Sequence, residues 1–116
     1  MINLVIVDVQ NDFMDDGVLP VKGAYKARDI IESYIEDYYD EIGIVICSQD
    51  CHPINHCSFR KFGGKFPVHC VCNTDGALTS IDPYVLSGLL VFDVHKGTRN
   101  DQEQFSAFSS CFRVSN

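Results

Sequence analysis

The sequence predicts an α/β fold built on a parallel sheet. Three apolar runs rich in β-branched residues have the length of buried strands, and they cover residues 2–9, 42–47 and 89–94. One amphipathic segment connects the first two runs, and a long loop region precedes the third. Strands separated in this way favour parallel pairing with right-handed crossovers. We therefore expect the carboxyl ends of the strands to share one edge, where open α/β sheets bind ligands.

The first strand and the helix after it are the clearest elements. Residues 2–9 alternate little in polarity, which is typical of a central strand covered on both faces. Residues 10–22 are rich in Asn, Asp, Gly and Pro and should form a loop. From 24 to 39, apolar residues recur at helical spacing with acidic residues between them, so this segment should be an amphipathic helix.

The second half of the chain is less regular. Residues 42–47 should form the second strand, and 48–73 a long loop region that holds three of the four histidines. A loop of this length in a compact domain is usually functional. Residues 82–88 could form one or two helical turns, 89–94 the third strand, and 109–116 show no clear pattern. We expect residues 1–116 to form a single domain, or part of one.

Composition excludes several classes of protein. The formal charge of −7 argues against nucleic acid or an anionic membrane as partner, because their phosphates would repel the chain. The N-terminal apolar run is too short for a signal peptide or a membrane span, so we expect a cytoplasmic protein. The six cysteines should then be thiols and not a disulfide framework. A redox role for the cysteines at 51, 57, 70 and 72 is a weaker alternative. No glycine-rich phosphate-binding motif is present.

Charged side chains follow all three expected strands. Asp8 ends the first strand, Asp50 and His52 follow the second, and Lys96 follows the third. On a parallel sheet they would meet at one edge, with Lys96 as the natural partner of Asp8. Asp8 could then act as a general base and Lys96 could lower the pKa of a nucleophile. Taken singly, Asp8 could be a turn former and Lys96 a solvated lysine.

The long loop region carries a candidate metal site. Asp50 and His52 with His69 would offer one carboxylate and two imidazoles, which suit Zn, Fe or Mn and leave positions open for water or substrate. Taken alone, His69 would more often be a structural histidine. His56 could be a fourth ligand, a group behind the ligands or a residue that stabilises the loop.

Aromatic and apolar side chains interrupt the polar loops beside these groups. Phe13, Leu19 and Phe66 could form the walls of a pocket for a flat heteroaromatic ligand. They could equally anchor their loops on the core.

Four ordered motifs resemble the nicotinamidase/pyrazinamidase branch of the isochorismatase-like cysteine hydrolases, over about residues 2–108. They are VDVQNDF (7–13), SQDCHPINHCSF (48–59), FPVHCV with TDGA (66–71 and 74–77), and KGT with FSAF (96–98 and 105–108). The resemblance implies a three-layer, Rossmann-like α/β fold, of which this sequence would hold part. It also implies hydrolysis of nicotinamide to nicotinate and ammonia through a thioester, a step of NAD salvage.

The resemblance also implies roles for individual residues. Asp8 and Lys96 fall on the catalytic Asp and Lys of the family, and the metal ligands would be Asp50, His52 and His69, holding Zn or a similar divalent ion that positions the ring nitrogen of the substrate. Phe13 and Phe66 match positions that pack on the ring. Phe66 and Cys51 stand where Trp is common, so the pocket wall could differ.

One part of the family pattern has no match. The nucleophilic Cys of the family lies several tens of residues beyond the Lys, after a further strand and at the start of a helix. Cys111 is only 15 positions past Lys96 and does not fit that pattern. A complementing C-terminal segment or a second copy of the chain could complete the site. The alternative function is a non-catalytic metal-binding or assembly module, or another cysteine hydrolase of the same family.

Overall fold

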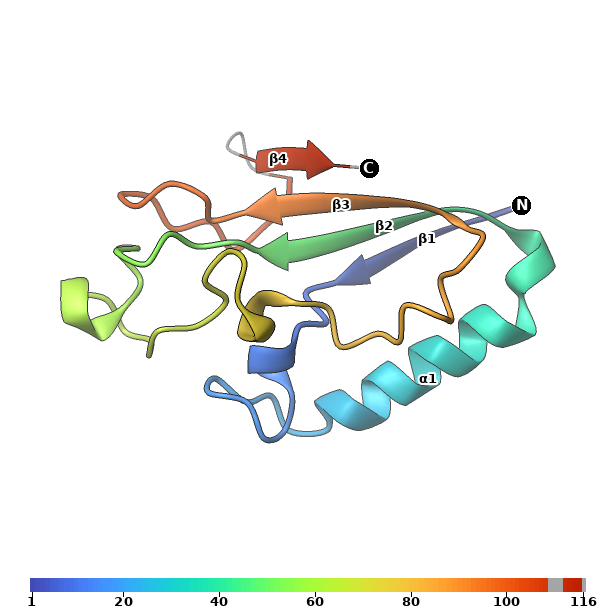
Figure 1. The fold of residues 1–116 in the computed structure, drawn as a ribbon, viewed down its shortest axis with the longest axis horizontal. Coiled ribbons are helices and arrows are strands. Elements are labelled where there is room, and N and C mark those ends of the chain that lie inside the picture. The colour runs from blue at the N-terminus through green and yellow to red at the C-terminus, as the bar shows by residue number, and fades with distance from the viewer. Residues whose placement is uncertain (109–111, 116) are drawn as a thin grey trace.

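A computed structural model describes residues 1–108 and 112–115, with side chains described up to residue 108. The sheet has the order β1-β2-β3-β4, from β1 (Ile2–Val7), β2 (Ile42–Asp50), β3 (Leu90–Lys96) and β4 (Phe112–Ser115). β1, β2 and β3 run parallel, and β4 pairs antiparallel with β3 (Figure 1). The expected α/β class with a parallel sheet is therefore confirmed, with an antiparallel edge strand that the sequence did not indicate. Cys111 lies outside the described residues.

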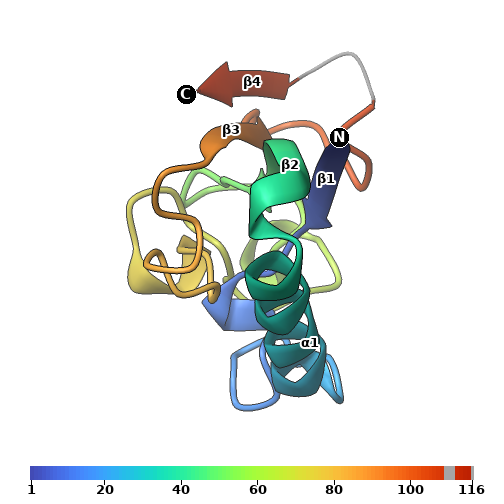
Figure 2. The ribbon, with the colours of Figure 1, turned by 90° about the vertical axis from the view of Figure 1, so that its right-hand side faces the viewer.

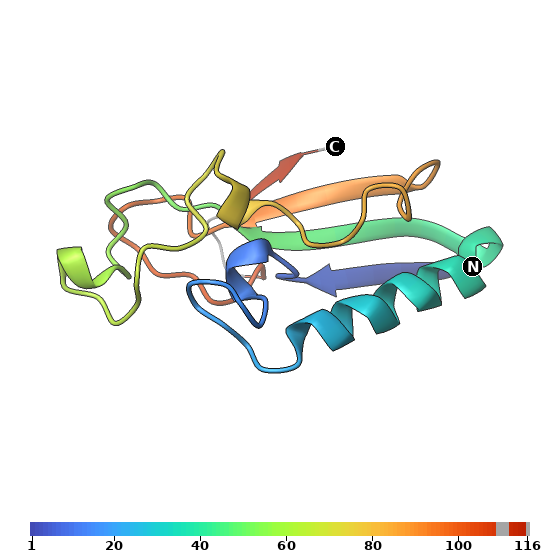
Figure 3. The same cartoon turned by 60° about the horizontal axis from the view of Figure 1, so that its bottom comes forward.

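The helix α1 (Ala24–Asp37) lies along one face of the sheet, and Figures 2 and 3 show it beneath β1 and β2. Its buried Ile35 packs with strand residues that include Ile6 and Val45, and the loop residue Ile81 completes the same cluster. Burial of this apolar surface is the main force that holds the helix to the sheet. The described residues contain no helix with the length and apolarity needed to cross a membrane.

Among the described residues, only the segment around Phe105–Phe108 lies over the other face of the sheet, which is largely exposed. Val5 and Val7 of β1 are 53% and 66% exposed, so the expectation of a first strand covered on both faces is wrong for the described part of the chain. Their alternating neighbours Leu4 and Ile6 face α1, because successive side chains of a strand point to opposite faces. The structure describes two layers, and an apolar surface is left where a third would lie.

Most of the expected boundaries differ by a few residues. The helix ends at Asp37 and is followed by a short 3-10 turn, Tyr39–Glu41. β2 extends three residues beyond the apolar run, to Asp50, because Asp50 still pairs with Lys96 on β3. The segment 82–88 forms turns and not a helix. The longer β2 places Asp50 directly at the carboxyl edge of the sheet.

Candidate metal centre and catalytic pair

Three charged side chains meet at the carboxyl edge of the sheet. The Lys96 ammonium Nζ lies 2.6 Å from Asp50 Oδ1 and 3.0 Å from Asp8 Oδ2. The Lys96 side chain is 4% exposed, so its charge is neutralised mainly by these two carboxylates. The sequence predicted the Lys96–Asp8 pair, but not that Lys96 would also bind Asp50. Lys96 thus connects the expected catalytic pair to the expected metal site.

A buried cluster of possible metal ligands lies beside Lys96. The ligand atoms of Asp50, His52 and His69 all lie within 4.8 Å of one another, and all three residues are buried. Asp50 Oδ2 is 3.5 Å from His52 Nε2 and 3.9 Å from His69 Nε2, while its other oxygen binds Lys96. The structure therefore brings together the three residues proposed from sequence.

The two imidazoles are held in the orientation that metal binding requires. His52 Nδ1 donates to the carbonyl oxygen of Gly97 at 2.7 Å, and His69 Nδ1 donates to that of Pro67 at 2.8 Å. Because a carbonyl oxygen can only accept, each Nδ1 carries a proton, and each Nε2 is directed toward Asp50 as the ring atom that a metal ion could bind. Gly97 has φ +64°, and a side chain there would collide with the His52 ring. One carboxylate with two imidazoles fits zinc or a related divalent ion.

His56 does not point a free nitrogen at this cluster. Its Nδ1 lies 2.7 Å from Ser58 Oγ, and its Nε2 lies 3.0 Å from the carbonyl oxygen of Gln102. Its ring stacks on that of His52, with centroids 3.9 Å apart. Of the alternatives left open by the sequence, the geometry favours a residue that supports His52 and ties the 97–104 loop to the cluster.

Aromatic rings surround the two imidazoles. Phe13 and Phe66, the expected pocket walls, each have a ring centroid 5.8 Å from that of His69. Phe59, which the sequence analysis did not single out, is fully buried and packs edge-on against His52, with centroids 5.7 Å apart. Its only sequence signal was a Phe in the polar loop region. The third expected wall residue, Leu19, donates its N–H to the Asp12 carbonyl oxygen at 3.0 Å, within its own loop.

Gln10 is a further residue of the site that sequence reasoning missed. Its fully buried side chain accepts from the backbone N–H of Asp50 at 2.9 Å and donates to the Asp50 carbonyl oxygen at 2.8 Å. It also donates to the carbonyl oxygen of Ala77 at 2.9 Å. Gln10 thus completes the backbone pairing of β2 beyond the end of β1. Its place in a polar loop gave no hint of burial.

The charges of the site shift the pKa values of its members. Burial by itself would raise the pKa of Asp50, but its hydrogen bond with His52 and the positive charge of Lys96 more than offset this and lower the pKa. Burial would lower the pKa of Lys96, yet the charges of Asp50 and Asp8 raise it. At neutral pH Lys96 is therefore charged and lies between two carboxylates.

The thiols near the site are not activated. Burial raises the pKa of the Cys47 thiol to about 11, and burial together with the Asp50 charge raises that of Cys70. Cys70 Sγ faces the carbonyl oxygen of Gly76 at 4.0 Å. A nucleophilic thiol needs a lowered pKa. Within residues 1–108, no hydrogen bond joins a cysteine sulfur to Asp8 or Lys96.

Two cysteines contradict the expectation that all six are free thiols. Cys51 and Cys72 form a disulfide, with Cα atoms 4.6 Å apart. The reason is local geometry: His52 N–H donates to the Cys70 carbonyl oxygen and Cys72 N–H to that of His52, both at 2.9 Å, so the two segments run side by side. A separation of 21 residues with no CxxC spacing gave no signal of this pairing.

Comparison with curated proteins supports the resemblance, although no family model matches the chain. The chain is 32% identical over 120 residues to the nicotinamidase of Escherichia coli K12, an alignment that covers 90% of this chain and 55% of the relative. It is 38% identical over 77 residues to the nicotinamidase/pyrazinamidase of Mycobacterium tuberculosis, covering 64% of this chain and 41% of that protein. The chain thus spans about half the length of these relatives.

Solved structures agree with the sequence relatives. The pyrazinamidase of Pyrococcus horikoshii, solved in complex with zinc, is 37% identical with a TM-score of 0.80, covering 91% of this chain and 57% of that one. The PnC1 protein of L. infantum, solved with nicotinate, is 31% identical with a TM-score of 0.76, covering 91% and 52%. Over the part of the fold that it spans, the chain is therefore similar to nicotinamidases and pyrazinamidases in both sequence and structure.

Proposed function

We propose that this chain carries the metal and acid–base portion of a nicotinamidase-type enzyme, which hydrolyses nicotinamide to nicotinate and ammonia. The observation that carries the proposal is Lys96, which binds both Asp8 and Asp50 and so connects a base to a buried cluster of metal ligands. The relatives named nicotinamidase and the neighbour solved with nicotinate support the substrate class. We further propose that residues 1–116 form one partial domain of a cytoplasmic protein.

The proposed metal ligands are Asp50, His52 and His69. The buried carboxylate and the two oriented imidazoles support a divalent ion, with zinc preferred because the Pyrococcus horikoshii relative was solved with zinc. Bound there, the ion would act as a Lewis acid that orients the pyridine nitrogen of the substrate. The rings of Phe13 and Phe66 pack against His69 and would border the substrate beside such an ion.

The proposed catalytic pair is Asp8 with Lys96. Asp8 has φ +52°, which turns its carboxylate back toward Lys96, and Ser48 Oγ donates to Asp8 Oδ1 at 2.8 Å. Asp8 would accept the proton of an incoming thiol, and the charge of Lys96 would stabilise the thiolate. Asp8 and Phe13 also line a cavity of about 330 Å³, whose other walls include Val21 and Ala24 and none of the three proposed metal ligands.

We propose that a complementing segment, from a longer chain or from a second copy, supplies the nucleophile. The open face of the sheet supports this, because Val5, Val7 and Phe105 line a cavity of about 440 Å³ that reaches Lys96. These apolar side chains are 53%, 66% and 75% exposed, and burying them against another segment would be favourable. A cysteine carried by that segment could reach the Asp8–Lys96 pair.

Release of ammonia from nicotinamide tests the enzymatic proposal. The zinc-loaded chain should turn over nicotinamide once the complementing segment is present, and Asp8→Asn should abolish turnover with zinc still bound. The matched control is Asp93→Asn, a carboxylate on β3 that faces away from Lys96. Lack of turnover in the completed protein would contradict the proposal.

A second function has one observation in its favour. The described thiols at Cys47 and Cys70 have raised pKa values and are not positioned at Asp8. The chain could therefore be a metal-binding or assembly module without chemistry of its own. If the completed protein binds zinc and nicotinate but releases no ammonia from nicotinamide, this second function is favoured.

A further inference from the structure

The Cys51–Cys72 disulfide joins the two chain segments that carry the proposed metal ligands. Cys51 lies between Asp50 and His52, and Cys72 follows His69 by three residues. The bond therefore fixes the end of β2 to the segment that presents His69. Neither cysteine contributes to the metal cluster itself, so the bond acts on the site by holding its ligands in place.

The noncovalent links between these two segments include an edge-on contact of the His52 and His69 rings, whose centroids lie 4.9 Å apart. Two backbone hydrogen bonds of 2.9 Å join them, from His52 N–H to Cys70 and from Cys72 N–H to His52. Cys70, beside His69, adopts φ +48°, a conformation that a non-glycine residue rarely holds without support from its surroundings. The disulfide adds a covalent restraint at a place where the backbone is strained and two backbone hydrogen bonds connect the segments.

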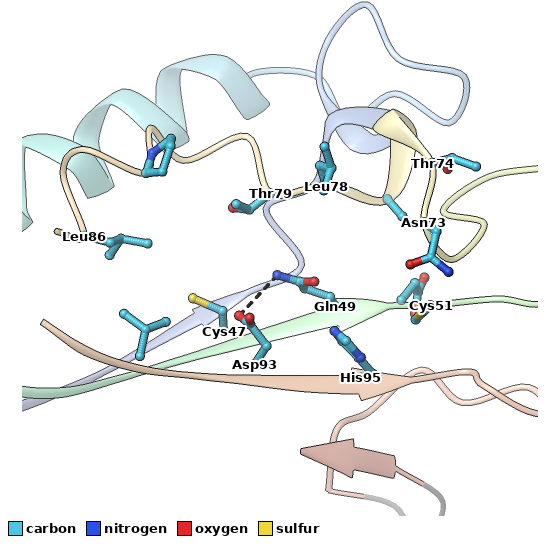
Figure 4. A pocket seen from close by; sticks show the side chains of 14 residues that line it. Cys47, Gln49, Cys51, Asn73, Thr74, Leu78, Thr79, Leu86, Asp93 and His95 are labelled. Carbon is cyan, nitrogen blue, oxygen red and sulfur yellow. Dashed lines mark hydrogen bonds between the residues drawn. The ribbon is translucent and has the colours of Figure 1, made fainter. Parts of the chain in front are cut away.

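The disulfide can be reached from solvent. Cys51 lines a cavity of about 390 Å³ together with Gln49, Asp93, His95 and Asn73. Figure 4 shows Cys51 at one end of this cavity, beside Asn73 and near His95. Cys51 and Cys72 are each half-buried, while the metal ligands are buried. A small thiol can therefore approach the disulfide without displacing the ligands.

We propose that the Cys51–Cys72 disulfide is a redox-sensitive latch on the metal centre, opened by low-molecular-weight thiols. The inference rests on the proposed metal site. A thiolate RS⁻ attacks one sulfur, the S–S bond breaks, and the other cysteine leaves as a thiolate that takes up a proton. A second RSH then resolves the mixed disulfide. The products are two cysteine thiols and one RSSR, so two electrons pass from the small thiols to the protein.

Opening the latch weakens metal binding because His52 and His69 lose a shared restraint. Loss of an outer contact that orients a metal ligand typically weakens metal affinity by about 10–100-fold. The latch lies outside the ligand set and two backbone hydrogen bonds remain, so we expect the lower end, about tenfold. The reduced protein should keep its fold, since the cluster of Ile35, Val45 and Ile81 does not involve the bond.

The test measures zinc affinity by competition with a chromogenic chelator, with the disulfide oxidised and with it reduced. Peptide mass mapping after alkylation establishes the state of Cys51 and Cys72, and circular dichroism monitors the fold. Reduction should weaken zinc binding about tenfold. Cys51→Ser/Cys72→Ser should bind zinc like the reduced protein under both conditions, which also controls for chelation by the reductant. Cys57→Ser, which removes a half-buried free cysteine, should keep the full redox dependence.

The possible outcomes test the latch and the metal site separately. Equal zinc affinity in the two redox states overturns the latch and leaves the metal site standing. Absence of zinc binding in both states refutes the metal site and the latch with it. Free thiols at both positions in the air-oxidised protein also overturn the latch. If the double serine variant loses its fold, the comparison of the oxidised and reduced native sequence still decides the question.

Discussion

Replacing Lys96 by Met should destabilise the fold strongly. Lys96 Nζ lies 2.6 Å from Asp50 and 3.0 Å from Asp8. At an effective dielectric constant near 20, these distances correspond to attractions of about 6 and 5.5 kcal/mol, most of which is offset by desolvation. Removing one member of a buried pair leaves an uncompensated charge and costs about 3–5 kcal/mol. That is a large part of the ~5–15 kcal/mol that stabilises a typical domain.

Urea unfolding in the presence of a metal chelator measures this loss. The midpoint for Lys96→Met should fall by at least about 1 M urea, given a slope of about 1–3 kcal/mol/M. Lys96→Met/Asp50→Asn should be more stable than Lys96→Met, because the second change removes the stranded carboxylate. A loss below about 1 kcal/mol, or a double variant whose loss equals the sum of the two single losses, would refute the proposed buried coupling.

Three further perturbations test other parts of the structure. Gln10→Leu should cost about 2–4 kcal/mol in urea unfolding, because it leaves buried backbone groups of Asp50 without partners. Gln49→Leu is the control: its side chain donates to Asp93 over a long 3.4 Å, so its loss should cost under about 1 kcal/mol. Asp15 accepts from the N–H groups of Tyr25 and Gly23, which lower its pKa from the ordinary value of an aspartate. Asp15→Ala should therefore be destabilising at pH 7, and thermal melts should show the difference shrinking as pH falls through the folded pKa. Cys47, with its pKa raised to about 11, should react with iodoacetamide at pH 8 at least about tenfold more slowly than a free cysteine peptide, and an equal rate would contradict its burial.

Sequence reasoning located the strand-end groups because parallel strands must place their carboxyl ends together. Asp8, Asp50 and Lys96 each follow an apolar run, so their meeting required only the correct topology. His69 was harder to place, since it lies 17 residues beyond His52 along an irregular loop. It was proposed as a ligand because it shares the loop region with Asp50 and His52, the family resemblance supported this, and the structure adds the distances and the orientation of its ring.

Other features could not be predicted from the local pattern of the sequence. Gln10 and Phe59 lie in polar loops, and their burial depends on segments that are distant in sequence. The Cys51–Cys72 bond likewise depends on a long loop returning beside the end of β2. Strand β1 appeared covered on both faces, because a β-branched run has the same composition whether or not a second layer packs on it.

Zinc stoichiometry tests the central claim most directly. The metal-free chain is titrated with zinc, and the bound metal is measured after gel filtration for the native sequence, for His69→Ala and for His95→Ala. We predict one zinc per chain for the native sequence and for His95→Ala, whose side chain lies on the opposite face of β3 from Lys96. His69→Ala should lose at least about tenfold in affinity, because one of three ligands is gone. Equal zinc binding by His69→Ala and the native chain would contradict the assigned metal centre.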